Sequence, residues 1–182
     1  MKWSFFLKHK DNQYDVILNF IKKFINTTKH TIKLWRCDGA GENKKLPDIL
    51  AKDNIYIQFK FTPRETPQYN GIVERAFATL YGRVRAMLNG AKLPKNVREK
   101  MWAEAANTAT KLDVILSTEK GKDCPFFLVY GKMPKYINCL RVFGEIGIIT
   151  ISNNNQIKAK LSDRGIPAMF SGYPDDYSSD SY

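Results

Sequence analysis

The pattern that predicts the fold class lies in residues 2–36, which read KWSFFLKHKDNQYDVILNFIKKFINTTKHTIKLWR. Aromatic and branched side chains dominate residues 2–8 between flanking lysines, and this composition predicts a strand. In residues 15–26 apolar side chains recur at helical spacing after Asn12, a favourable N-cap residue, which predicts an amphipathic helix. Residues 30–36 return to the strand pattern. Because a strand, a helix and a second strand in this order are typical of a crossover unit, we predict an α/β fold.

The segment that follows continues the alternation and ends in a long helix. Residues 44–54 predict a short helix and residues 55–61 an alternating strand. Residues 62–71, TPRETPQYNG, have the proline, asparagine and glycine of a turn. The helix that follows has one apolar face, which is formed by Val73, Phe77, Leu80, Val84 and Leu88. Arg75, Thr79 and Arg83 lie on the opposite face, so one side of this helix packs and the other is basic.

The remaining elements are shorter. Residues 96–116 predict a second helix with a face of small residues suited to close packing. Residues 141–151 and 168–173 predict brief strands.

Length, charge and cysteine content narrow the class of protein. With 182 residues the chain forms one domain, or one domain and a short extension, because domains run about 100 to 150 residues. The 29 Lys and Arg exceed the 18 Asp and Glu, and the net charge of +11 favours a polyanionic partner such as nucleic acid. The 3 cysteines lack CxxC spacing, which argues against a disulfide framework and a self-contained zinc site. Since no apolar run is long enough for a membrane span or a signal peptide, we expect an intracellular protein without a membrane partner.

Two carboxylates are candidates for metal-assisted chemistry. Asp38 follows the strand that ends at Arg36, and Glu74 lies in the first turn of the long helix. The carboxyl end of a strand and the start of a neighbouring helix lie at one rim of an open α/β sheet, where both side chains can converge. Carboxylates are natural ligands of Mg²⁺, and phosphate chemistry often uses two such ions about 3.5 to 4 Å apart. Taken singly, Asp38 also fits an ordinary surface turn, and Glu74 fits a side chain that complements the helix dipole.

Five segments, in order along the chain, resemble the integrase of Ty1/copia-type retrotransposons. They are WRCDGAGEN, TPRETPQYNGIVERAFATLYGRVRAML, LPKNVREKMWAEAANTATKL, LVYGKMPKYINCLRVFG and LSDRGIPAMFSGYP. The resemblance covers nearly the whole chain, and TPQYNGIVER is its most specific part. The spacing of thirty-five residues between Asp38 and Glu74 adds to it.

The resemblance implies a fold, a chemistry and a set of partners. Residues 1–136 would form a ribonuclease-H-like integrase core, with a mixed sheet flanked by helices, and residues 137–182 a small extension with short strands. In this family an acidic triad of two Asp and one Glu binds two Mg²⁺ or Mn²⁺ ions, and the resemblance makes Asp38 the second acid and Glu74 the third. Such enzymes trim the 3′ ends of element DNA and join them to target DNA by phosphoryl transfer. We therefore expect element and target DNA as partners, a homo-oligomer on that DNA, and a nuclear location during integration.

Candidate DNA contacts lie before and along the long helix. In the family the loop before the catalytic helix meets the DNA end. In this sequence the arginines of that helix add positive charge. The candidates are Gln68, Tyr69, Asn70, Arg75, Arg83 and Arg85. The three uncharged residues would position the strand by hydrogen bonds and stacking, and the arginines would contact phosphates.

The sequence departs from the family in two respects. In the family the first catalytic Asp lies on a strand just upstream of the one that residues 3–8 resemble. No segment of this sequence matches that strand, so we expect the core to lack it. We expect Asp11 and Asp15 to face solvent and not to replace the missing Asp. His9 and His30 have no cysteine pair that would complete a zinc module, so neither is expected to be a ligand. A carboxylate attracts a nearby cation by roughly several kcal/mol at an intermediate dielectric, so the loss of the first catalytic Asp would greatly weaken metal binding. We therefore expect this chain alone not to integrate DNA.

Two other functions fit the sequence. One is a non-catalytic nucleic-acid-binding or assembly remnant of a retroelement polyprotein, whose DNA binding would depend steeply on salt and not on metal. The other is a different enzyme on the same fold, such as a ribonuclease or a bacterial transposase. The latter fits less well because residues 94–144 also match the copia pattern.

Overall fold

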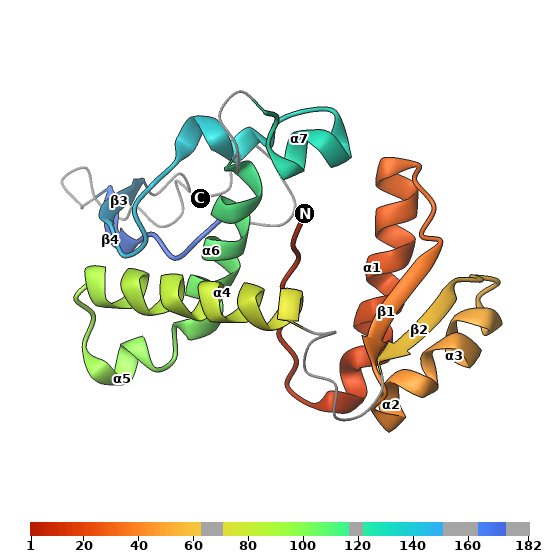
Figure 1. The fold of residues 1–182 in the computed structure, drawn as a ribbon. Helices are drawn as coiled ribbons and strands as arrows, with labels where there is room; N and C mark the ends of the chain where they lie inside the picture. The colour runs from red at the N-terminus through yellow and green to blue at the C-terminus, as the bar shows by residue number, and fades with distance from the viewer. Residues whose placement is uncertain (63–70, 117–121, 151–163, 174–182) are drawn as a thin grey trace. The chain divides into compact units, whose positions relative to one another are not determined.

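Figure 1 shows the chain in a computed structural model, which describes residues 1–62, 71–116, 122–150 and 164–173. The chain divides into two structural units. The N-terminal unit comprises residues 5–79 and 129–131, and the C-terminal unit comprises residues 1–4, 80–128 and 132–182. No helix in the described ranges is long and apolar enough to cross a lipid bilayer.

The N-terminal unit contains a parallel pair of strands, β1 (Leu34–Asp38) and β2 (Gln58–Thr62). Leu34 pairs with Gln58 and Asp38 with Thr62, so the carboxyl ends of both strands lie at the same edge. Parallel strands need a crossover connection. Helices α2 (Gly41–Lys44) and α3 (Leu46–Lys52) supply it, as Figure 1 shows. This arrangement agrees with the predicted α/β class.

A small apolar core holds the N-terminal unit together. Helix α1 (Gln13–Thr28), which follows the short helix η1 (Lys10–Asn12), contacts α3. Ile21 of α1 and Leu46 and Leu50 of α3 are almost completely buried. Each such side chain stabilises the fold by about 1.5–3 kcal/mol relative to leaving it exposed. The crossover helix is therefore anchored by packing against α1.

The predicted strand over residues 2–8 is wrong, because the backbone there forms no strand. A strand satisfies its backbone groups only beside a partner, and within the described residues β1 pairs with β2 alone. Phe5 packs instead against Phe20 of α1, with 5.4 Å between the ring centroids. The crossover unit therefore lies in residues 34–62 and not in residues 2–36.

Helices dominate the C-terminal unit and the segment leading into it. They are α4 (Gly71–Gly90), α5 (Lys95–Arg98), α6 (Trp102–Ile115) and α7 (Pro125–Tyr130). Helix α4 begins directly after the turn-forming segment, as predicted, whereas the predicted helix over residues 96–116 is divided into α5 and α6.

The small residues of α6 allow α4 to pack closely against it. Val84 and Leu88 of α4 form a buried cluster with Ala105 and Ala106 of α6 and with Phe143. Of the predicted apolar face of α4, this C-terminal half is buried, whereas Val73 and Phe77 are exposed. The short side chains of the two alanines explain why these helices can approach.

The last described part of the chain is an antiparallel pair of strands, β3 (Ile146–Thr150) and β4 (Gly165–Met169). Both predicted strands are present, with shifted bounds. A short helix, η3 (Lys135–Cys139), precedes them, and its Tyr136 stacks on Tyr173 with 4.7 Å between ring centroids. Thr108 of α6 donates a hydrogen bond to the Ser171 carbonyl over 3.2 Å, so residues beyond β4 are tied to α6. The division of the chain at residues 136 and 137 stays a prediction.

Candidate functional site

Asp38 is the last residue of β1 and lies beside Thr62, the last residue of β2. Its side chain is exposed. The chain turns immediately after it through Gly39, where an added Cβ would lie 3.3 Å from the Thr62 carbonyl oxygen. Glycine at this position therefore lets the turn pass close to β2, and the Asp38 carboxylate stands at the carboxyl edge of the sheet, the usual ligand-binding edge of α/β proteins.

Polar contacts hold the Asp38 side chain in place. The backbone N–H of Ala40 donates to Asp38 Oδ1 over 3.3 Å. Asn43 of α2 donates its side-chain Nδ2–H to the same carboxylate oxygen, and the same nitrogen lies 3.4 Å from the Asp38 carbonyl oxygen. Asn43 accepts in turn from Gln13 Nε2 of α1, over 2.7 Å. The DGAGEN segment is thus a loop and a short helix with defined internal contacts, attached to α1.

Glu74 lies in the first turn of α4, as predicted, and its side chain is exposed. Residues 63–70, which join β2 to α4, lie outside the described residues. The convergence of Asp38 and Glu74 on one cation therefore stays a prediction.

Asp38 and Glu74 offer oxygen ligands, which suit hard cations such as Mg²⁺ and Mn²⁺. Burial, together with the negative charge of the neighbouring Asp38, raises the pKa of the Cys37 thiol above its usual value. Within the described ranges no three or more His, Cys, Asp or Glu side chains group closely enough to hold a metal. The donor chemistry fits a divalent cation, and the described residues contribute at most two carboxylates to it.

Three of the predicted DNA contacts, Gln68, Tyr69 and Asn70, lie outside the described residues. Arg75 and Arg85 are exposed on α4. The Nε–H of Arg75 donates to the Gly71 carbonyl over 3.2 Å, which leaves the terminal amino groups of its guanidinium for another partner. Both arginines can meet a phosphate group.

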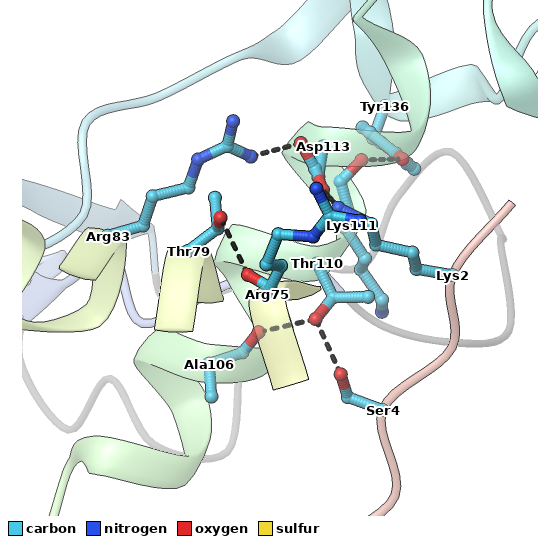
Figure 2. A network of polar contacts seen from close by, with 10 residues as sticks. All are labelled: Lys2, Ser4, Arg75, Thr79, Arg83, Ala106, Thr110, Lys111, Asp113 and Tyr136. Atoms are coloured by element: carbon cyan, nitrogen blue, oxygen red, sulfur yellow. Dashed lines mark hydrogen bonds and ion pairs between the residues drawn. The ribbon is translucent and has the colours of Figure 1, made fainter. Parts of the chain in front are cut away.

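Arg83 has a protein partner that the sequence pattern did not reveal. Figure 2 shows that Arg83 and Lys2 both contact the carboxylate of Asp113, which lies near the end of α6. The Lys2 Nζ lies 2.5 Å from Asp113 Oδ2. Partial burial alone would raise the pKa of Asp113, but the hydrogen bonds and charges of Lys2 and Arg83 outweigh it and hold this pKa below its usual value.

Periodicity places Arg83 on the basic face of α4 and gives no signal for this pairing, because Asp113 and Lys2 are distant in the sequence. The sequence clue was Asp113 itself, which is one of the two acidic residues of α6. Ser4 and Thr110 share a further hydrogen bond of 2.7 Å beside the ion pairs (Figure 2). This cluster therefore attaches residues 1–4 to α6.

Comparisons with known proteins identify relatives that match nearly all of the chain. It is 31% identical over 177 residues to the retrovirus-related Pol polyprotein from transposon TNT 1-94 of Nicotiana tabacum, a match covering 96% of this chain and 13% of that protein. Over 172 residues it is 27% identical to the corresponding polyprotein from transposon RE1 of Arabidopsis thaliana, with 94% and 11% covered. The polyprotein from transposon RE2 of the same plant is 29% identical over 173 residues, with the same coverage.

No family model and no solved structure matches the chain. The chain spans between 11% and 13% of the length of these three curated relatives. The resemblance seen in the sequence and these matches over nearly all of the chain agree. The chain therefore belongs to the retrovirus-related Pol polyproteins of copia-type retrotransposons and corresponds to a segment of such a polyprotein.

Proposed function

We propose that this segment contributes to the integrase core of the polyprotein, a ribonuclease-H-like domain that joins element DNA to target DNA. The observation that carries the proposal is Asp38, which stands at the carboxyl edge of a parallel strand pair inside a loop of defined contacts. The parallel strands, their helical crossover and the helix that begins near Glu74 support the ribonuclease-H-like assignment. The matches to transposon Pol polyproteins supply the biological context.

In this proposal Asp38 and Glu74 hold a divalent cation, and Mg²⁺ or Mn²⁺ fits their oxygen donors. A cation bound there would stabilise the charge that develops on the phosphoryl oxygens during the reaction. The protein residues hold and orient the reactants. Arg75 and Arg85 bind backbone phosphates, and Gln68, Tyr69 and Asn70 position the DNA end. Arg83 is committed mainly to Asp113.

The two reactions of the proposal are hydrolysis and transesterification. Water first cleaves a phosphodiester near the 3′ end of the element, which releases a short piece and leaves a 3′ hydroxyl. That hydroxyl then attacks a target phosphodiester and displaces the target 3′ oxygen. We propose that the reaction takes place in the nucleus on a homo-oligomer bound to DNA.

The chain carries two of the three acidic positions of the family, so we propose that it is inactive by itself. The decisive experiment is strand transfer with oligonucleotide ends in Mg²⁺ or Mn²⁺. It compares the 182-residue chain with a protein extended upstream in the polyprotein. The extended protein is expected to be active and to lose activity in Asp38→Asn and in Glu74→Gln.

Two results would contradict the proposal. Activity of the extended protein that survives both substitutions would exclude the assigned carboxylates. DNA binding without any strand transfer, steeply dependent on salt and indifferent to metal, would favour the non-catalytic nucleic-acid-binding role.

A further inference from the structure

We infer that Asn43, oriented by Gln13, is a positioning residue for the Asp38 carboxylate. This inference rests on the proposed function, because it assigns a role to residues around the proposed cation ligand. Asn43 lies in α2 and Gln13 is the first residue of α1, so the contact joins two elements that are distant in the sequence. Both side chains are partly buried.

The direction of the hydrogen bonds follows from the chemistry of Asp38. An ionised carboxylate only accepts hydrogen bonds, so the group that Asn43 turns toward Asp38 must be its NH₂. The Asn43 oxygen then faces Gln13, and Gln13 must present its own NH₂, which it does over 2.7 Å. Each amide thus has its orientation set by the next group, and the series begins at the first turn of α1.

This arrangement leaves one oxygen of Asp38 for a ligand. The Ala40 N–H and the Asn43 side chain both donate to Oδ1. Within the parts of the chain that the structure describes, Oδ2 receives no hydrogen bond. A carboxylate that is held through one oxygen presents the other in a fixed direction, at the exposed edge of the sheet.

A second contact between α1 and the loop supports the same role. The hydroxyl of Tyr14 donates to the Glu42 carbonyl over 3.2 Å. Helix α1 packs on α3 through buried apolar side chains, so the first turn of α1 is a firm support for Asn43 and Glu42. The support reduces the side-chain freedom that Asp38 would lose on binding a cation. Holding one such side chain in place corresponds to about threefold to tenfold in affinity.

The test uses Mn²⁺ alone as the probe and the 182-residue chain. Paramagnetic broadening of the Ala40 backbone amide in NMR spectra gives a dissociation constant specific to this loop. Asn43→Leu is expected to weaken Mn²⁺ binding by about threefold to tenfold. Gln13→Glu is also expected to weaken Mn²⁺ binding, because the new carboxylate can only accept a hydrogen bond and draws the Asn43 NH₂ toward itself. The amide oxygen of Asn43 then faces the Asp38 carboxylate.

Gln13→Glu separates positioning from simple attraction, because an added negative charge by itself would tighten Mn²⁺ binding. Gln58→Glu is the matched control, with the same charge change on an exposed residue at the opposite end of the sheet. The shift of the Asn43 side-chain NH₂ signals in Gln13→Glu reports the orientation directly. Thermal unfolding of each variant separates these effects from loss of the fold.

The outcomes distinguish the cation site at Asp38 from the positioning role of Asn43 and Gln13. If Asp38→Asn abolishes the broadening while Asn43→Leu and Gln13→Glu bind Mn²⁺ as tightly as the parent chain, the positioning role is overturned and the cation site stands. If Asp38→Asn leaves the affinity unchanged, the cation site and the positioning role are both overturned. Weaker binding in both positioning variants, with Gln58→Glu unchanged or tighter, supports the inference.

Discussion

Replacing Asp113 by asparagine tests the ion-pair cluster that attaches residues 1–4 to α6. The carboxylate is largely buried, whereas Lys2 and Arg83 are each roughly half exposed. A pair between partly exposed partners contributes about 0.5–1 kcal/mol, so losing both lowers the free energy of unfolding by about 1–2 kcal/mol. At about 2–4 °C per kcal/mol for a chain of this size, the melting temperature falls by several degrees.

The stabilisation by the Asp113 carboxylate depends on pH. Because the folded-state pKa of Asp113 is lowered, the unfolded chain binds more protons than the folded chain as the solution becomes acidic. The stabilisation is therefore complete above the unfolded pKa, about 3.9, and disappears as the pH falls through the folded pKa. The difference between the parent chain and Asp113→Asn should be full at pH 7 and shrink toward pH 3.

The assay is urea unfolding followed by circular dichroism at pH 7, 5 and 3. Glu99→Gln serves as the control, since Glu99 and Lys95 form an exposed pair with 3.9 Å between Oε1 and Nζ. Its midpoint should stay within error of the parent midpoint. If the Asp113→Asn chain is as stable as the parent at pH 7, or if the difference in stability is the same at pH 3 as at pH 7, the ion pairs of Asp113 do not stabilise the fold in this way.

Three further predictions concern separate parts of the chain. Gly144→Ala should lower the free energy of unfolding by about 1–3 kcal/mol in urea titrations. Gly144 has φ 85°, which is unfavourable for alanine, and an added Cβ would clash with Ala91 after the end of α4. At pH 8 Cys37 should react with iodoacetamide more slowly than the exposed Cys139 by mass spectrometry, because its pKa is raised. Arg85→Gln should reduce the salt slope of DNA binding by about one, whereas Arg83→Gln should mainly lower the melting temperature.

Elements with a strong local pattern could be predicted from the sequence. Residues 62–71 end one element with turn chemistry, and α4 begins at Gly71 with a 3.6-residue apolar period. The strand patterns at β1 and β2 were likewise correct within a few residues. Such patterns succeed because the hydrogen bonds of a helix, and the alternation of a half-buried strand, are properties of consecutive residues.

The strand predicted at residues 2–8 failed for the opposite reason. Its composition suits a strand, but a strand exists only beside a partner, and the partner is a matter of tertiary structure. In the structure Ser4 bonds to Thr110, and Phe5 packs on Phe20. Composition reports which backbone a segment prefers, whereas pairing decides whether it adopts it.

In the candidate site, too, local sequence features could be predicted, whereas contacts between distant residues could not. Asp38 and Glu74 could be chosen from the sequence because a carboxylate after a strand and one at a helix start are local features. The hydrogen bond between Gln13 and Asn43, and the pairing of Arg83 with Asp113, were decided by tertiary structure. Hydrogen bonds and ion pairs form between atoms a few ångströms apart, and folding brings together residues whose sequence positions carry no trace of that proximity.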